Sequence, residues 1–127
     1  MTQERKQALL DAGIAVDDAL ERCMGNEMLL ERLLDKFAED KTYAELLHAM
    51  SEKNQAVAVR AAHTLKGVCG NLSMSHLYHL LDKQVEVLRQ SDWDSAEELM
   101  PVITHEYQAL VLVANAFKHK NHSDSII

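Results

Sequence analysis

The sequence is poor in the residues that break helices or turn a chain sharply. Its 127 residues include four glycines and one proline, and the aromatic residues are one tryptophan, three tyrosines and two phenylalanines. Proteins built from β-sheets need many turn residues and are enriched in β-branched and aromatic side chains. This composition therefore argues against an all-β fold and favours helices along the whole chain.

Long apolar runs are also absent. The longest near-continuous one, ALVLVANAF at 109–117, is too short to cross a bilayer, and the N-terminal segment MTQERKQALLDAG is too charged for a secretory signal. The two cysteines, Cys23 and Cys69, have neither metal-ligand spacing nor a disulfide framework. We expect them to be buried thiols of a protein in a reducing compartment, the cytoplasm.

An excess of positive charge is missing as well. The chain has 13 basic and 20 acidic residues, a formal net charge of -7. This balance argues against a general affinity for nucleic acid or anionic membrane surfaces. We expect the partners to be proteins.

The hydrophobic pattern predicts two short helices followed by four long ones. The short segments span 3–12 and 15–25. The first long helix begins at Asn26, bends near EDKT at 39–42, and places one apolar stripe on a single face. The stripe consists of Leu29, Leu30, Leu33, Phe37, Ala44 and Leu47.

The remaining long helices have their own start signals. The second begins after Asn54, which can cap it, and runs to about Leu72. Ser73 or Ser75 is expected to cap the third, whose stripe comprises Leu77, Leu80, Leu81, Gln84 and Leu88. Asp92 or Asp94 starts the fourth, in which Pro101 lies on the solvent side and should cause a kink without a break.

Four amphipathic helices with short connections predict an all-α, antiparallel four-helix bundle with one or two short N-terminal helices packed on it. We expect residues 1–118 to form a single domain that is monomeric, and residues 119–127, which lack periodicity, to form a disordered tail. Leu112 faces away from its helix's core stripe, so either the N-terminal segment or a partner is expected to cover it.

The second long helix contains an unusual segment, HTLKGVCGNL at 63–72. Each glycine inside a helix costs about 1 kcal/mol relative to alanine, so Gly67 and Gly70 need a reason. On a helical wheel they lie on the same outward face as His63, together with Arg60 and Lys66. We interpret both glycines as clearing space around an exposed imidazole.

Chemically, this face suits the acceptance of a phosphoryl group. Neutral imidazole is a good nucleophile near neutral pH, and Lys66, one turn away from His63, can offset the charge of phosphoryl oxygens. Gly67, the next neighbour on that face, has no side chain to block a partner that delivers the group.

The motif HTLKG, continued by VCGNL, resembles the signature of the histidine-containing phosphotransfer domain, a four-helix module of phosphorelays. The resemblance extends through the flanking segments, from Gly13 to Phe117. It departs from the family at Ser73, where glycine is frequent, and near Val85, where a polar residue is frequent.

This resemblance implies a role for each residue of the motif. His63 would be phosphorylated on Nε2, Lys66 would stabilise the phosphoryl group, and Gly67 would provide access. Our interpretation of the helix face assigns Gly70 to access as well. Arg60, which lies outside the motif, is either a second contact to phosphate or receiver or an ordinary exposed arginine. Gln84, the nearest amide to the position of the missing polar residue, would accept a hydrogen bond from Nδ1 of His63.

The resemblance also implies a phosphocarrier and not an independent enzyme. Receiver domains of response regulators or hybrid sensor kinases would donate and accept the phosphoryl group through their aspartates. The chain has no glycine-rich nucleotide loop and no carboxylate cluster. We therefore expect no cofactor of its own, with Mg²⁺ bound by the partner receiver.

Other interpretations remain open. A helical adaptor that is not phosphorylated would be expected to lack His63 or Lys66, and both are present. The chain could also be a phosphoacceptor domain cut from a longer kinase, although Met1 and the polar tail favour a complete small protein. His76 with His79, and His119 with His122, have metal-ligand spacing, but no third ligand is evident and we predict no metal site.

Overall fold

The computed structural model describes the backbone of residues 1–126 and the side chains of residues 1–116. Within this part the chain is helical without a strand, which confirms the all-α prediction. None of the helices is both long and apolar enough to cross a membrane, judged over the described residues. The helices are α1 (Gln3–Asp11), α2 (Val16–Arg22), α3 (Glu27–Glu39), α4 (Thr42–Glu52), α5 (Gln55–Asn71), α6 (Ser75–Arg89) and α7 (Trp93–Ile126).

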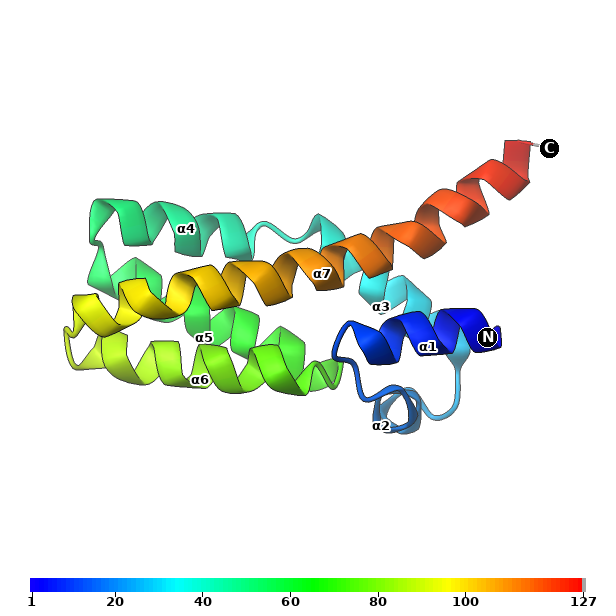
Figure 1. Cartoon of the computed structure of the whole chain (residues 1–127), viewed down its shortest axis with the longest axis horizontal. Helices are drawn as coiled ribbons and strands as arrows, with labels where there is room; N and C mark the ends of the chain where they lie inside the picture. Colours follow the sequence, from blue (N-terminus) through cyan, green and yellow to red (C-terminus); the bar gives the residue numbers. More distant parts are fainter. Residues whose placement is uncertain (127) are drawn as a thin grey trace.

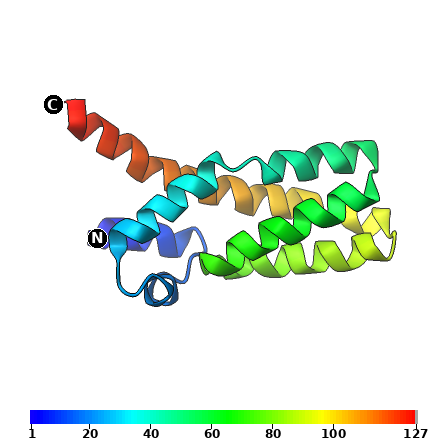
Figure 2. The ribbon, with the colours of Figure 1, turned by 180° about the vertical axis from the view of Figure 1, so that it is seen from behind.

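The helices form an elongated bundle (Figures 1 and 2). Helices α4, α5, α6 and α7 lie along its long axis, and α3 extends beside α7 at the end where α1 and α2 pack. The backbone N–H of Ala15, just before α2, donates to the carbonyl of Ser73 between α5 and α6 at 3.0 Å. This hydrogen bond joins the N-terminal helices to the end of the α5–α6 pair.

The first long helix is broken, and our prediction of one helix with a bend was wrong. Asp40 has extended backbone angles, φ -68° and ψ 140°, and its carboxylate accepts from the backbone N–H of Thr42 at 2.6 Å. The two halves, α3 and α4, therefore have independent rotations about their axes. Consequently Ala44 and Leu47, which we expected in one stripe with α3, are exposed, and Leu46 is buried instead.

Side-chain caps fix the starts of four of the described helices. Thr2, Asn26, Asn54 and Asp92 each accept a hydrogen bond from the backbone N–H three residues later, as such residues do at helix N-termini. The predicted serine cap of α6 is wrong. Met74 precedes that helix without a side-chain cap, and the Ser73 hydroxyl donates to the Asp18 carboxylate on α2.

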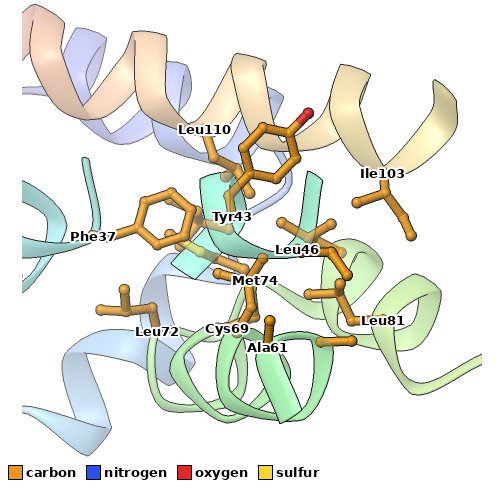
Figure 3. Packing of buried hydrophobic residues seen from close by; sticks show 14 of the residues in the cluster. Phe37, Tyr43, Leu46, Ala61, Cys69, Leu72, Met74, Leu81, Ile103 and Leu110 are labelled. Atoms are coloured by element: carbon orange, nitrogen blue, oxygen red, sulfur yellow. The ribbon is translucent and has the colours of Figure 1, made fainter. Parts of the chain in front are cut away.

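Buried side chains from all of the helices α3 to α7 meet in one core (Figure 3). The Tyr43 and Tyr107 rings stack with centroids 4.0 Å apart, and the Tyr43 hydroxyl hydrogen-bonds to the Thr104 hydroxyl. These contacts join α4 to α7 at the edge of the core. The largest fully buried side chains of the core are Phe37, Leu9, Ile14, Leu30, Leu34, Leu46, Leu65, Met74, Leu77, Leu81, Leu88 and Ile103.

Helix α7 continues without a break through Pro101, which is exposed as predicted. Leu112 is 73% exposed, so the N-terminal segment does not cover it, and the other alternative, contact with a partner, stays a prediction. The helical trace runs on to Ile126, through the segment predicted to be a disordered tail. Residue 127 and the side chains from residue 117 lie outside the described part, so the domain boundary at 118 and the order of the tail stay predictions.

Candidate functional site

Helix α5 is a platform with one buried and one open face. The buried face consists largely of small residues, Ala58, Ala61, Ala62, Leu65 and Cys69. Small side chains let neighbouring helices pack closely, and close packing makes a bundle helix stiff. Arg60, His63, Thr64 and Gly67 are exposed on the other side.

His63 points to solvent from the middle of α5, as the sequence predicted. Among the described residues its imidazole has no hydrogen-bond, ion-pair or ring partner. Both ring nitrogens are therefore available, and neither is held by a neighbouring side chain. This is the arrangement expected of a nucleophile that meets its reaction partner on another molecule.

Open space continues one turn along the helix, at Gly67. A Cβ atom built there would have no heavy atom of a neighbouring element within 4 Å. Gly67 also lines a hollow of about 510 Å³ bounded by α2, the end of α5 and the start of α6. The open space predicted at this position is present, and its use as access for a partner stays a prediction.

Gly70 lies at the interface of α5 with α6. A Cβ atom there would lie 3.3 Å from Cε2 and 3.4 Å from Cδ2 of Tyr78 on α6. The Tyr78 ring occupies the place of the missing side chain, while the backbone of Gly70 also lines the hollow beside Gly67. Gly70 thus allows α6 to approach α5, which the sequence did not predict, and its assignment as an access residue stays a prediction.

Lys66 is engaged with α6. Its Nζ lies 3.1 Å from Oδ1 of Asp82 and 5.9 Å from the centroid of the Tyr78 ring. The side chain is only 19% exposed. Because Lys66 is three residues after His63, its flexible stem still starts beside the imidazole. The predicted stabilising cation is therefore present, and it already has an anionic partner.

The structure treats the remaining two predicted site residues, Arg60 and Gln84, differently. Arg60 is exposed, and the described residues provide it with no ion-pair partner, so it stays a candidate contact. Gln84 is fully buried, and its Nε2 donates to the carbonyl of Ala96 at 2.9 Å. Its Oε1 has no partner in the core. Gln84 is a core residue and does not orient the exposed His63, so we correct that assignment.

Two other histidines, His76 and His79, have partners of their own. Nδ1 of His76 lies 3.2 Å from Oε1 of Glu106, and the His79 ring contacts Tyr78 edge to face. Over the residues that the structure describes, no three His, Cys, Asp or Glu side chains gather as metal ligands would. His119 and His122 lie outside the described side chains.

Comparison of the sequence with models of protein families identifies the family of this chain. The model of the Hpt domain family matches residues 26–112, more than half of the chain, including the segment from His63 to Gly67. This chain belongs to the Hpt domain family. Comparisons with curated proteins and with solved structures found no match. Hpt domains serve histidine phosphotransfer in two-component signalling, act as phosphocarriers rather than enzymes, and interact with receiver domains.

Sequence reasoning missed two residues beside the site of this Hpt domain, Tyr78 and Asp82. Both lie on α6 and reach α5 across the helix interface. No motif identifies them, because Asp82 is 16 residues from Lys66 in the chain. Only the rotation and registry of α6 against α5 bring these side chains to Lys66.

Proposed function

We propose that this chain relays a phosphoryl group between receiver-domain aspartates through His63. The observation that carries the proposal is the free, exposed imidazole on a stiff helix with open space at Gly67. An acyl phosphate on another protein can approach such a ring without a rearrangement of the bundle. The membership of the Hpt family supports the same chemistry.

The transfer balances with the groups that the two proteins supply. A ring nitrogen of neutral His63, Nε2 by the resemblance, attacks phosphorus of the receiver's aspartyl phosphate. The new N–P bond forms as the P–O bond to the aspartyl carboxyl breaks, and the aspartate leaves as a carboxylate with the electron pair. The proton on the other ring nitrogen stays in place. The reverse reaction with a second receiver moves the phosphoryl group onward.

Work in this relay is divided between the partners. Positioning dominates in-line phosphoryl transfer, and α5 provides a fixed place for the nucleophile. Lys66 supplies positive charge to the phosphoryl oxygens, and Arg60 is placed to contact the phosphoryl group or the receiver. The carboxylates and Mg²⁺ are the receiver's contribution, so the chain acts as a carrier without a nucleotide or metal site of its own.

The proposed partners are receiver domains of response regulators or hybrid sensor kinases, met one at a time by a monomer. The setting is the cytoplasm, since both Cys23 and Cys69 are free thiols, as is usual in a reducing compartment.

The test is a label-transfer experiment with a receiver phosphorylated on its aspartate in the presence of Mg²⁺. We expect the protein to acquire label that is lost in mild acid, as from a phosphoramidate. His63→Gln should abolish uptake and leave the circular dichroism and unfolding midpoint unchanged. His48→Gln, which alters another exposed histidine on α4, should retain uptake. Label on the His63→Gln variant would disprove the site, and no label on any variant would favour the adaptor alternative.

A further inference from the structure

Lys66 is paired before any phosphoryl group arrives. Its ammonium crosses from α5 to α6, where Asp82 holds it at 3.1 Å and the face of Tyr78 lies 5.9 Å away. Asp82 itself is 59% exposed, so its carboxylate is not needed to fill the core. Asp82 therefore has no evident packing role. Its one contact of interest is the ion pair with Lys66, the lysine three residues after His63.

Gly70 and Tyr78 position the Lys66–Asp82 ion pair between α5 and α6. Gly70 lets the Tyr78 ring pack directly against α5, where any Cβ would force the ring to move. Tyr78 and Asp82 are one turn apart on α6 and face the same lysine. We refer to Tyr78 and Asp82 together as the Lys66 cradle. The cradle draws the ammonium toward α6 while the lysine stem remains one turn from His63.

We propose that Asp82 is a positioning residue that competes with the phosphoryl group for Lys66 and so keeps phosphorylated His63 a ready donor. The inference rests on the proposed relay function. A lysine ammonium is a compact charge on a flexible stem that can turn between two nearby anions. When Lys66 turns to the phosphoryl oxygens it gives up part of its attraction to Asp82.

The competition has a direction. Asp82 stabilises the unphosphorylated state through Lys66 and, as a nearby negative charge, disfavours the phosphorylated state. Both effects shift the equilibrium of phosphoryl transfer away from phosphorylated His63 and toward the aspartyl phosphate of the receiver. A relay gains from this balance, because a carrier that held its phosphoryl group too firmly would not pass it on.

The equilibrium of phosphoryl transfer tests the proposal. A phosphorylated receiver is mixed with the wild-type protein or with Asp82→Asn, and label on each protein is measured when the ratio is constant. We expect Asp82→Asn to shift the ratio about two- to fivefold toward the phosphohistidine, the size of an exposed ion-pair effect. In a Lys66→Gln background the part of this shift that acts through the lysine should disappear, and only the smaller direct effect of the Asp82 charge on the phosphoryl group should remain.

A matched control separates this role from general electrostatics. Asp17→Asn breaks the Lys6–Asp17 pair, which joins α1 to α2 at 3.0 Å, and it should leave the equilibrium unchanged. An unchanged ratio in Asp82→Asn, or an equal shift in the Lys66→Gln background, would overturn the proposal. A purely structural Asp82 would change the unfolding midpoint but not the ratio.

A second measurement needs no phosphoryl transfer. Acylation of Lys66 in the unphosphorylated protein, followed by mass spectrometry of its peptide, should be about twofold faster in Asp82→Asn. The side chain is then no longer held by Asp82, and the reagent reaches its neutral amine, which is the attacking form, more easily. Equal rates would contradict the pairing. If the wild type takes no label, the relay and this inference fail together. If label reaches His63 but Asp82→Asn matches the wild type, the inference alone fails.

Discussion

A Cβ atom on Gly70 would lie 3.3 Å from the ring of Tyr78, closer than side chains normally pack. The second glycine of the motif, Gly67, would meet nothing within 4 Å. The two glycines of α5 thus have separate purposes, although they look equivalent in the sequence. Gly70 accommodates a neighbouring helix, and Gly67 lies in open space one turn from His63.

Alanine substitutions should separate the two glycines by stability. Gly67→Ala should raise the free energy of unfolding by up to about 1 kcal/mol, because alanine is the better helix former and has room. Gly70→Ala should gain less or be destabilised, since the Tyr78 ring must shift. Urea unfolding followed by circular dichroism measures both. A destabilised Gly67→Ala variant would show that the space there is not free.

A large side chain at Gly67 should hinder the partner and not the fold. We expect Gly67→Leu to slow label uptake from a phosphorylated receiver by about tenfold or more, since small displacements of reacting groups are costly. Its unfolding midpoint should not fall. Ala44→Leu, at an exposed position on α4, serves as the control and should transfer normally. Normal uptake by Gly67→Leu would refute the access argument.

The ion pair between Arg5 and Glu31 should matter for stability. The guanidinium donates from Nε and Nη2 to the two carboxylate oxygens at 2.9 and 2.7 Å and also contacts the Val113 carbonyl. Both side chains are about one-tenth exposed. Arg5→Met, which keeps the apolar stem, should cost about 3 kcal/mol because Glu31 is left as a buried unpaired charge.

An exposed pair provides the comparison. Lys6→Met removes the partner of Asp17, and Lys6 and Asp17 are 40% and 86% exposed. This variant should lose about 1 kcal/mol or less, as surface pairs do. Chemical denaturation gives both values. Equal losses for Arg5→Met and Lys6→Met would mean that burial of the Arg5 pair contributes nothing.

Acid should weaken the contact between α2 and the α5–α6 connection. The hydrogen bond from Ser73, followed by that from Arg22, holds the pKa of Asp18 below its ordinary value of 3.8. The ionised form is therefore preferred in the folded state. Its contribution to stability is complete above pH 3.8 and is lost as the pH falls through the lower folded-state pKa.

The Ser73→Ala variant isolates this effect. Its stability deficit relative to the wild type should narrow as the pH is lowered from about 5 to about 2, because protonated Asp18 no longer favours the folded state. Thermal unfolding at a series of pH values measures the difference. If the difference in stability between the wild type and Ser73→Ala stays constant across this pH range, the ionised form of Asp18 is not its cause.

The thiol of Cys69 should be inert in the folded protein. Burial raises its pKa to about 12, and only the thiolate reacts readily with alkylating reagents. We expect alkylation to be negligible under native conditions and complete in denaturant, as read by mass spectrometry. The exposed-face variant Thr64→Cys provides a reactive reference on the same helix. Equal rates at the two cysteines would contradict the burial.

Within a single helix, the sequence determined the essentials. The 3.6-residue period places His63, Lys66 and Gly67 on one outward face, whatever the rest of the fold does. The caps at Asn54 and Asp92 act on backbone groups three residues away, so local sequence was sufficient for these starts. The apolar stripes required the helices to pack together, which gave the all-α fold.

Contacts between helices were decided by the tertiary structure alone. The break at Asp40 resets the rotation of α4, and the registry of α6 against α5 puts Tyr78 on Gly70 and Asp82 on Lys66. The same packing of α6 buries Gln84 in the core, where its side chain cannot contact the exposed His63. The periodicity of one helix contains no information on how its neighbour is rotated or shifted along it. Packing of many side chains at once fixes both, and so it sets the partners of the reactive face.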